Sequence, residues 1–215
     1  MVKVVYVCGL PGTGKNTVLA KVMERIQSNK DIKVVSFGDV IDEVVKKDFP
    51  ELEVQRDKIR TAFSYEEQKS IIYNALSKII HRFNDSEVLF LHGHSVLSTH
   101  YGYLPGFPTI LYKSIKDFYS ETPFNISLLV HIIAKPEEIA ERRKKDKTRN
   151  RDIESITEIK NHLELSTMAI HSIAFNMFVP LIILTNSDGC LDKVADEFCR
   201  VLVNREVLSE EDIKK

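Results

Sequence analysis

The most constraining feature of the sequence is a glycine-rich stretch, Gly9 to Thr17, which reads GLPGTGKNT. It follows a short apolar run that ends at Cys8, and it precedes a segment, Val18 to Ile26, with the apolar spacing of a helix. Strand, glycine-rich turn and helix start, in this order, form a phosphate-binding loop when the turn matches G-x-x-x-x-G-K. Its glycines allow successive N–H groups to point into one concavity, which the helix N-terminus also faces. The sequence therefore predicts a nucleoside triphosphate site.

The residues of this loop are the predicted contacts to the nucleoside triphosphate. Lys15 supplies a positive charge for the outer phosphates, and Asn16 stands where a Ser or Thr hydroxyl usually binds Mg²⁺. An amide oxygen is a weaker directional ligand, so we expect Asn16 to be a weak Mg²⁺ ligand, with water and substrate oxygens completing the shell. The predicted donor-binding residues are Gly9, Pro11, Gly12, Thr13, Gly14, Lys15, Asn16 and Thr17.

Composition and charge narrow the class of protein. The chain has 215 residues, enough for one domain with a substantial core, and its 30 basic and 31 acidic residues create no bulk field toward nucleic acid or membrane. The three cysteines, an odd number in or near apolar segments, predict reduced thiols and not a disulfide framework. No apolar run approaches the ~20 residues that span a bilayer, and Met1 leads directly into a predicted strand. We therefore expect a soluble cytoplasmic protein that binds neither nucleic acid nor membranes.

Short apolar runs alternate with longer amphipathic segments along the chain, which is typical of a parallel sheet covered by helices on both faces. We find no internal repeat and no linker, so we predict an α/β fold with one domain over residues 1–205. Residues 206–215 are mostly charged, and we expect them to form a solvated, frayed tail. The predicted strands are Val2–Cys8, Ile32–Ser36, Glu87–Leu91, Ser127–Ala134 and Pro180–Leu184.

Polar residues follow the second predicted strand. Asp39 is placed to cap a helix from about Val40 to Lys47, which is the structural interpretation of that residue. Farther on, Arg56 and Arg60 lie four residues apart and share one face of a helix. Such a pair is most often a solvated surface, which the pattern alone favours, and forked hydrogen bonds to a phosphate are the alternative.

Histidines and aromatic residues gather after the third predicted strand. His92, His94 and His100 lie within nine residues, which allows a zinc site, but no cysteine or fourth ligand is adjacent and polar packing is favoured. The following stretch, Gly102 to Pro108, holds two glycines and two prolines, so we expect a stiff, shaped loop. Its aromatic side chains, which include Tyr103, offer flat faces for a nucleotide base.

The segment from Pro136, which begins a predicted helix, to Asp152 is strongly basic. Its charges allow two interpretations: a solvated basic loop, or a positive flap that closes over a polyphosphate. The flap is favoured once the phosphate-binding loop is considered with it. In an extended chain Arg149 and Arg151 point to the same side, and Arg142 lies closer to the start of the segment.

Five stretches, in this order and at these separations, make the chain similar to the archaeal-type adenylate kinases: the glycine-rich loop, SFGDV, QRDKIR, GHSVLSTHYGYLPGFP and DKTRNRD. The resemblance extends from about Lys3 to Val203, and GYLPGFP is its most specific element. It implies a nucleoside monophosphate kinase with the P-loop NTPase fold, a three-layer sandwich around a five-stranded parallel sheet. It also implies an acceptor flap at about 37–83, a short lid at about 142–153 and, in many members, a homotrimer.

The resemblance assigns roles to residues of this sequence. Phosphate-binding roles fall on Lys15, Arg60, Arg142, Arg149 and Arg151, and all of these except Arg60 are the implied catalytic residues. Acceptor-nucleotide contacts fall on Gly38, Asp39, Arg60, His94, Gly102, Tyr103 and Gly106. The implied reaction transfers the γ-phosphoryl group of MgATP to AMP and yields two ADP, so ATP and Mg²⁺ are the implied cofactors.

Three residues depart from the family pattern. His92 stands where relatives usually carry an aspartate, Ser98 where they carry a basic residue, and Thr167 where an arginine is expected. Each lost charge-assisted contact to a phosphate removes ~1.5–3 kcal/mol. The chain is therefore interpreted as a divergent member, with two alternatives: a non-catalytic ATP-binding module that presents a surface to a partner, or a kinase for another small monophosphate such as CMP.

Overall fold

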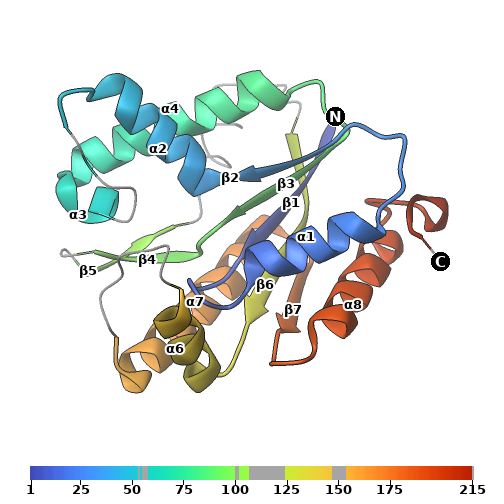
Figure 1. Ribbon diagram of the computed structural model, residues 1–215. Coiled ribbons are helices and arrows are strands. Elements are labelled where there is room, and N and C mark those ends of the chain that lie inside the picture. The colour runs from blue at the N-terminus through green and yellow to red at the C-terminus, as the bar shows by residue number, and fades with distance from the viewer. Residues whose placement is uncertain (53, 55–57, 100–101, 107–123, 147–153, 215) are drawn as a thin grey trace.

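The computed structural model describes residues 1–215 apart from 53, 55–57, 100–101, 107–123, 147–153 and 215, and apart from the side chain of Arg60. Its centre is a five-stranded sheet in the order β2-β3-β1-β6-β7, in which every neighbouring pair is parallel (Figure 1). The strands are β1 (Val2–Cys8), β2 (Ile32–Ser36), β3 (Val88–Gly93), β6 (Phe124–Ile133) and β7 (Leu181–Thr185). All five coincide with the predicted runs to within a few residues at each end, so the predicted α/β fold is confirmed.

The central strand β1 shows why the sheet carries helices on both faces. Val4 and Tyr6 pack into one apolar cluster, whereas Val5 and Val7 pack into a second cluster on the opposite face. Successive side chains of a strand point to opposite faces, so a strand that is apolar at every position is buried on both sides. Since all five strands are parallel, the loops that follow their carboxyl ends meet at one edge of the sheet.

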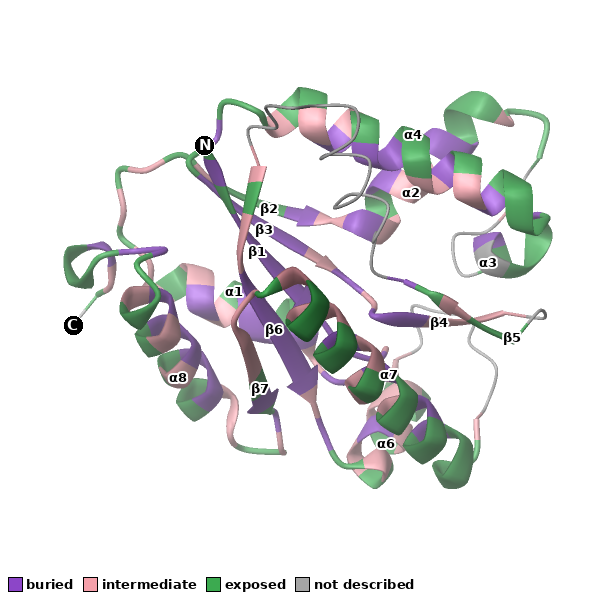
Figure 2. Ribbon diagram, turned by 180° about the vertical axis from the view of Figure 1, so that it is seen from behind, coloured by how far each residue is buried: buried purple, intermediate pink, exposed green. Residues whose placement is uncertain are grey.

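Helices form the two outer layers. In Figure 1, α1 and α8 lie in front of the sheet and α7 lies behind it, while α2 and α4 cover the region next to β2. The helices are α1 (Lys15–Arg25), α2 (Phe37–Asp48), α3 (Ile59–Ala62), α4 (Tyr65–Phe83), α6 (Pro136–Lys145), α7 (Ile156–Met177) and α8 (Leu191–Asn204). Figure 2 shows their buried residues turned mainly toward the sheet and their exposed residues turned outward. Among the described residues, no helix is both long and apolar enough to cross a membrane.

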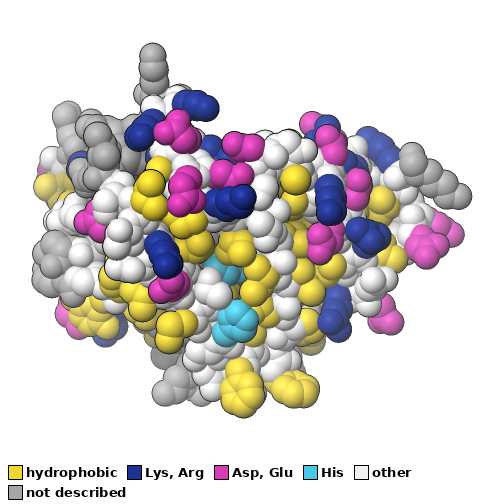
Figure 3. All heavy atoms as spheres, turned by 90° about the horizontal axis from the view of Figure 1, so that it is seen from below, with side chains coloured by type: hydrophobic (Ala, Val, Ile, Leu, Met, Phe, Trp, Pro, Cys, Tyr) yellow, Lys and Arg dark blue, Asp and Glu magenta, His cyan; other side chains and the backbone are white. Residues whose placement is uncertain are grey.

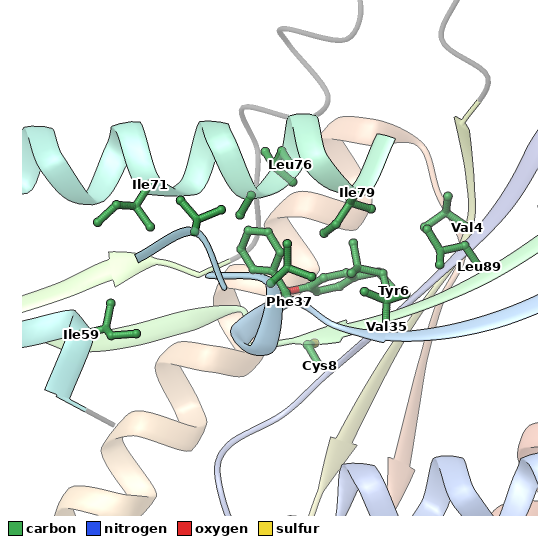
Figure 4. Packing of buried hydrophobic residues seen from close by; sticks show 14 of the residues in the cluster. Val4, Tyr6, Cys8, Val35, Phe37, Ile59, Ile71, Leu76, Ile79 and Leu89 are labelled. Carbon is green, nitrogen blue, oxygen red and sulfur yellow. The ribbon is translucent and has the colours of Figure 1, made fainter. Parts of the chain in front are cut away.

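The cluster between the sheet and α4 reaches the edge where the strands end. In Figure 4, Tyr6 and Phe37 lie side by side beneath α4. Both approach Gly93, where an added Cβ would lie 2.7 Å from the Tyr6 hydroxyl oxygen and 3.5 Å from the Phe37 Cβ. A larger residue at position 93 would therefore push these two rings out of the core.

Local signals fix the helix starts. Ser64 and Glu67 form the capping box of α4. Pro136 occupies the first turn of α6, as predicted. The predicted cap at Asp39 is wrong, because Ser36 caps α2: its hydroxyl accepts a hydrogen bond from the Asp39 backbone N–H at 3.3 Å. The sequence SFGD holds two residues of the capping type, and the earlier one, which is the last residue of β2, caps the helix.

A short antiparallel hairpin, β4 (Val96–Thr99) with β5 (Gly102–Pro105), lies outside the main sheet. The strand pattern does not predict it, because four residues are too few to show a clear alternation. The hairpin packs against α7, where the ring of Tyr103 lies 5.2 Å from the ring of His162. The expected stiff loop, Gly102 to Pro108, thus includes β5, which is paired with β4 in this hairpin.

The C-terminal residues do not form the solvated, frayed tail that their charge predicts. Val207 and Leu208 are buried, and a 3₁₀ turn, Glu210–Asp212, follows them. Asp212 is only 8 % exposed and forms an ion pair with Lys30, whose Nζ lies 2.6 Å from Asp212 Oδ2. This ion pair connects the C-terminal residues to the segment after α1. Charge alone does not predict this burial, because a carboxylate that is paired with an ammonium group can be buried.

Candidate nucleotide-binding site

The glycine-rich stretch forms the turn between β1 and α1, as its sequence predicts. Gly12 and Gly14 have φ angles of 92° and 83°, in the left-handed region that side chains disfavour. Neighbouring atoms also exclude larger residues. A Cβ added at Gly14 would lie 2.4 Å from Asn186 Nδ2, and one added at Gly9 would lie 2.2 Å from the Ile132 carbonyl oxygen. Both the dihedral angles and the close approach therefore require glycine.

The helix α1 begins at Lys15, directly after the loop, with Gly14 as its N-cap. No described side chain caps its first amides, and Asn16 and Thr17 in the first turn are exposed. The first N–H groups of a helix have no intrahelical partner, and the helix dipole favours negative charge beside them. The loop and helix start thus form a concave site suited to phosphate.

Lys15 is folded over the loop instead of extending into solvent. Its ammonium donates hydrogen bonds to the Gly9 carbonyl at 2.6 Å and the Leu10 carbonyl at 3.2 Å, and the residue is 9 % exposed. These carbonyls hold the charge inside the loop. A phosphate entering the loop would offer the ammonium a charge-assisted partner, which is about twice as strong as a neutral one.

Asn186 anchors the loop from the end of β7. Its Nδ2 donates to the Thr13 carbonyl at 2.9 Å, and its backbone N–H donates to the Ile133 carbonyl at 2.8 Å. Its own carbonyl accepts a hydrogen bond from Arg142 at 2.9 Å. Asn186 is buried, so this one residue joins the loop to β6, β7 and α6.

Two arginines of α6 lie against the loop. Arg142, a predicted catalytic residue, forms an ion pair with Asp188 at 2.6 Å. Arg143 donates from Nε to the Pro11 carbonyl at 2.8 Å and forms an ion pair with Glu154. The guanidinium of Arg142 is therefore held at the rim of the loop, and Arg143 connects the loop to the segment just before α7.

A cavity of about 500 Å³ opens beside the loop and continues toward α2, α3 and α4. Gly9 and Thr13 are buried within the loop. The other predicted donor-binding residues line the cavity, namely Pro11, Gly12, Gly14, Lys15, Asn16 and Thr17. Of the remaining predicted residues, those that also line it are Gly38, His94, Gly106 and Arg142.

The part of the cavity formed by α2, α3 and α4 is mostly apolar. Its apolar lining residues are Phe37, Ile41, Ile59, Ile71 and Ile72. Gln68, in the first turn of α4, is a buried polar residue among them, and its Nε2 donates to the Phe63 carbonyl at 2.9 Å. The cavity therefore joins a phosphate-binding loop to a space suited to a flat, weakly polar group.

His94 connects the end of β3 to the loop. Its Nδ1 lies 2.9 Å from the Gly9 carbonyl oxygen, and its own carbonyl accepts from the Tyr6 hydroxyl at 2.9 Å. Because a carbonyl only accepts, the proton is assigned to Nδ1. Burial, with a smaller contribution from Cys8, raises the pKa of Tyr6 well above its usual range, so its hydroxyl stays protonated and donates.

Other predicted residues do not line the cavity or fall outside the described residues. Asp39 is exposed in α2, and Gly102 and Tyr103 are exposed in the hairpin; none of these three lines the cavity. The predicted residues that fall outside the described part of the chain are Arg56, His100, Arg149, Arg151 and the side chain of Arg60.

The three residues that depart from the family pattern occupy different environments. His92 lines the cavity at the end of β3. Ser98 is half-buried in the hairpin, and Thr167 donates to the Leu163 carbonyl at 2.8 Å within α7. Of the three departures, His92 alone lines the cavity.

A buried polar group lies behind the loop. The Ser166 hydroxyl is 3.3 Å from His131 Nε2, and no described residue pairs with His131 Nδ1. Burial, with smaller contributions from Lys15 and His171, lowers the pKa of His131 to about 4. Burial raises the pKa of the Cys8 thiol to about 12. Both side chains are therefore neutral at pH 7 and support the loop without adding charge.

The residues present fit a Mg²⁺ ion that is held mainly by water and phosphate oxygens. Asn16 lies at the cavity, and Asp146 at the end of α6 is the one carboxylate among its described lining residues. Mg²⁺ prefers oxygen ligands and keeps several waters. Within the described part of the chain, no three His, Cys, Asp or Glu residues are grouped so that they could hold a metal.

Sequence reasoning missed three residues of the site: Gln68, Arg143 and Asn186. Asn186 directly follows the last strand. Because a polar residue at that position can reach the loop, its place in the sequence could have indicated its role. Arg143 was one of four consecutive basic residues, and nothing in the pattern distinguished it from its neighbours. Gln68 lies in a helical segment whose polar positions usually face solvent.

Comparisons with known proteins agree with this geometry. A family model described as an AAA domain matches residues 8–160. The adenylate kinase of Methanocaldococcus jannaschii is 33 % identical over 201 residues, which cover 93 % of this chain and 98 % of the relative. That of Methanococcus vannielii is 31 % identical over 200 residues, covering 93 % and 97 %. A crystal structure of TT1252 from Thermus thermophilus aligns with a TM-score of 0.52 at 15 % identity, over 94 % of this chain and 97 % of that one, and supports the fold alone.

Proposed function

Because the chain belongs to the adenylate kinase family, we propose that it transfers the γ-phosphoryl group of MgATP to AMP and releases two molecules of ADP. The observation that carries this proposal is a single cavity that reaches from the phosphate-binding loop to the apolar space among α2, α3 and α4. A donor in the loop and an acceptor among those helices would meet within that cavity, as direct transfer between two nucleotides requires.

The donor side would act by positioning and by neutralising charge. The loop N–H groups and Lys15 would hold the donor phosphates, with Lys15 exchanging its present carbonyl partners for phosphate oxygens. Arg142, held by Asp188, would approach the transferring group together with Arg149 and Arg151. No general base is needed, since an oxygen of the acceptor phosphate is already an adequate nucleophile.

The acceptor side would hold AMP among α2, α3 and α4. Arg60 would bind its phosphate through forked hydrogen bonds, because the neighbouring residues Lys58 and Ile59 line the cavity. The other acceptor contacts that line the cavity are Gly38, His94 and Gly106. We take residues 1–205 as one kinase domain with an acceptor flap at about 37–83 and a lid at about 142–153. The exposed residues Asp39, Gly102 and Tyr103 would contact the acceptor only after the flap and the lid close.

When bound, Mg²⁺ would neutralise and orient the donor phosphates. Asn16 would be a weak ligand for it. We also propose a cytoplasmic location, where ATP and AMP are available, because the three cysteines are free thiols, as is usual in a reducing compartment.

We further propose that the protein forms a homotrimer through an apolar face at α7. Met168, Phe175 and Phe178 are exposed at 69 %, 86 % and 98 %. Figure 3 shows that hydrophobic and histidine side chains predominate in the lower half of that view, whereas charged side chains gather above them. Apolar side chains exposed together on one face commonly mark a protein interface. Light scattering after size exclusion should give a molar mass three times that of the monomer for the wild type. The Phe175→Ser, Phe178→Ser double variant should give the molar mass of the monomer. A monomeric wild type would refute the proposal.

A coupled assay of ADP release tests the proposed reaction. With MgATP and a panel of nucleoside monophosphates, we expect turnover that depends on AMP and yields two ADP for each AMP consumed. ATP binding by calorimetry without turnover on any acceptor would overturn the kinase proposal and favour a nucleotide-binding module.

A further inference from the structure

We propose that Gln68 selects the acceptor base by accepting a hydrogen bond from an exocyclic amino group, of the kind that adenine carries at C6 and cytosine at C4. The inference rests on the proposed function, because it assumes that the acceptor nucleotide occupies the part of the cavity lined by α2, α3 and α4. It adds the residue that distinguishes amino bases from those with a carbonyl at the same position.

The position of Gln68 is the first observation. Gln68 is 8 % exposed and lines the cavity from the first turn of α4. Among the described lining residues that α2, α3 and α4 contribute, it is the one buried polar side chain. A polar group at such a place is stabilised by hydrogen bonds or by a ligand that supplies them, and it penalises any group that does not match it.

The orientation of the amide is the second observation. The Phe63 carbonyl lies 2.9 Å from Gln68 Nε2 and can only accept, so the amide nitrogen must face it. The amide oxygen lies on the other arm of the planar group and is directed away from that carbonyl. The bond to Phe63 therefore prevents the side chain from flipping to present a donor in place of the oxygen.

The surrounding walls are the third observation. Ile41, Ile71 and Ile72 line the cavity near Gln68, and Leu97 lines it from the hairpin. Such apolar side chains pack against either face of a heteroaromatic ring without distinguishing one base from another. Discrimination then falls to the polar group. An amino group can donate to the Gln68 oxygen, whereas the carbonyl of guanine, hypoxanthine or uracil would place two acceptors against each other.

The hairpin contains residues for which the sequence predicted base contacts, but it is less suited than Gln68 to selecting the base. Tyr103 is exposed and its ring packs toward His162 of α7. Gly102 is also exposed, and among the described residues, apart from its chain neighbours, no atom lies within 4 Å of the place where a Cβ would be. Of the hairpin residues, Leu97 reaches the cavity, and it offers only apolar contact.

The test is a cycle that removes each partner of the proposed hydrogen bond. Wild type and Gln68→Leu are assayed with AMP and with purine riboside 5′-monophosphate, which is AMP without its amino group. For wild type, loss of the amino group should lower kcat/KM for the acceptor about tenfold, the effect of one buried hydrogen bond. For Gln68→Leu, the two acceptors should be used equally, and the KM for ATP should match wild type. Gln27→Leu, at an exposed position after α1, is the matched control and should retain the tenfold preference.

Equal losses for both acceptors in Gln68→Leu would show no coupling and would overturn the inference, leaving Gln68 a structural residue of α4. If Gln68→Leu does not fold, the wild-type acceptor panel decides: AMP and CMP should be preferred over IMP and UMP, and equal use would overturn the inference. If the wild type phosphorylates no acceptor, the proposed function fails. The inference is then decided by calorimetric Kd values for the same two nucleotides, where an equal Kd in wild type would overturn it.

Discussion

The donor side of the cavity and the acceptor side are built on different principles. On the donor side, Gly9, Lys15 and Asn186 are fixed by main-chain hydrogen bonds and by contacts that leave no room for a Cβ. On the acceptor side, the cavity lies among apolar side chains of α2 and α4, with one buried amide at Gln68. The first side is specified by polar geometry and the second mainly by packing.

This difference teaches where variation is tolerated. A loop whose backbone groups are the ligands keeps its function only if its dihedral angles are kept, so its residue types are restricted. An apolar cavity accepts many residues of similar volume. It follows that the donor side should respond strongly to single substitutions, whereas the acceptor side should respond through specificity.

The largest effect should come from Lys15→Ala, which tests the claim that the donor side depends on single groups. Loss of about two charge-assisted contacts to phosphate should lower kcat/KM for ATP by ~10³, or ~4 kcal/mol. Calorimetry should show weaker ATP binding, and thermal unfolding should show an intact fold. Lys21→Ala, on the same helix but paired with Glu24 at the surface, should be nearly normal. Unchanged ATP affinity in Lys15→Ala would remove the loop from the donor site.

The second prediction concerns the pH dependence of stability, and it tests whether the buried His131 behind the loop supports the donor side. Burial and the charge of Lys15 lower the pKa of His131 to about 4, below the ~6.5 of an unfolded histidine. Between these values the unfolded state binds more protons, so stability is full above pH ~6.5 and falls as the pH is lowered. His131 should therefore cost ~2 kcal/mol of unfolding free energy at pH 5 relative to pH 7.5.

Urea unfolding at both pH values measures this contribution. His131→Gln, which cannot titrate, should lose ~2 kcal/mol less than wild type over that interval. His81→Gln, at an exposed position of α4, should behave like wild type. Identical pH dependence in wild type and His131→Gln would show that the histidine is not held neutral by burial.

The third prediction sharpens the separation between the two sides. Asn186→Ala removes the hydrogen bond to the Thr13 carbonyl and the contact that confines Gly14. The KM for ATP should rise about twentyfold, or ~1.8 kcal/mol, while the KM for AMP stays within about twofold. Asn176→Ala, exposed on α7, is the control. Equal increases in both KM values would mean that the loop and the acceptor helices move as one unit.

The fold was predictable because its signals are local. The five apolar runs, the loop between β1 and α1, and the helix start at Pro136 each depend on residues adjacent in the sequence. The errors came from partners far apart in the chain. Asp212 is buried because Lys30 pairs with it, and the hairpin β4–β5 forms where its strands are too short to show a pattern.

The same contrast between local and long-range signals explains which site residues could be predicted from the sequence. The loop residues of the donor side were predicted because their motif is contiguous, and they line the cavity or lie within the loop. Gln68 and Asn186 were missed because their roles arise from packing across the fold. Asp39 and Tyr103, which the resemblance assigns to the acceptor, are exposed and do not line the cavity, so their roles stay a prediction.

The last prediction concerns His92, which lies at the cavity where the two sides meet. Its backbone is fixed by the parallel pairing of β3, which sets it opposite Val7 of β1 and Ser36 of β2. A neutral imidazole offers a nitrogen that Mg²⁺ disfavours, and an imidazolium would repel the metal. His92→Asp would supply a carboxylate that can hold metal-bound water. It should raise kcat at saturating MgATP about tenfold, or ~1.4 kcal/mol.

The competing outcome assigns His92 to the phosphates. The resemblance implies positively charged residues where this chain has Ser98 and Thr167, so an imidazolium at position 92 could replace one of them. In that case His92→Asp would be slower, and the wild-type rate would increase as the pH falls through ~6.5, where histidine gains its proton. Measuring kcat for both proteins from pH 5.5 to 8 separates the two roles, with His81→Asp as an exposed control. A faster variant and a wild-type rate that does not rise in acid would place His92 on the metal side of the site.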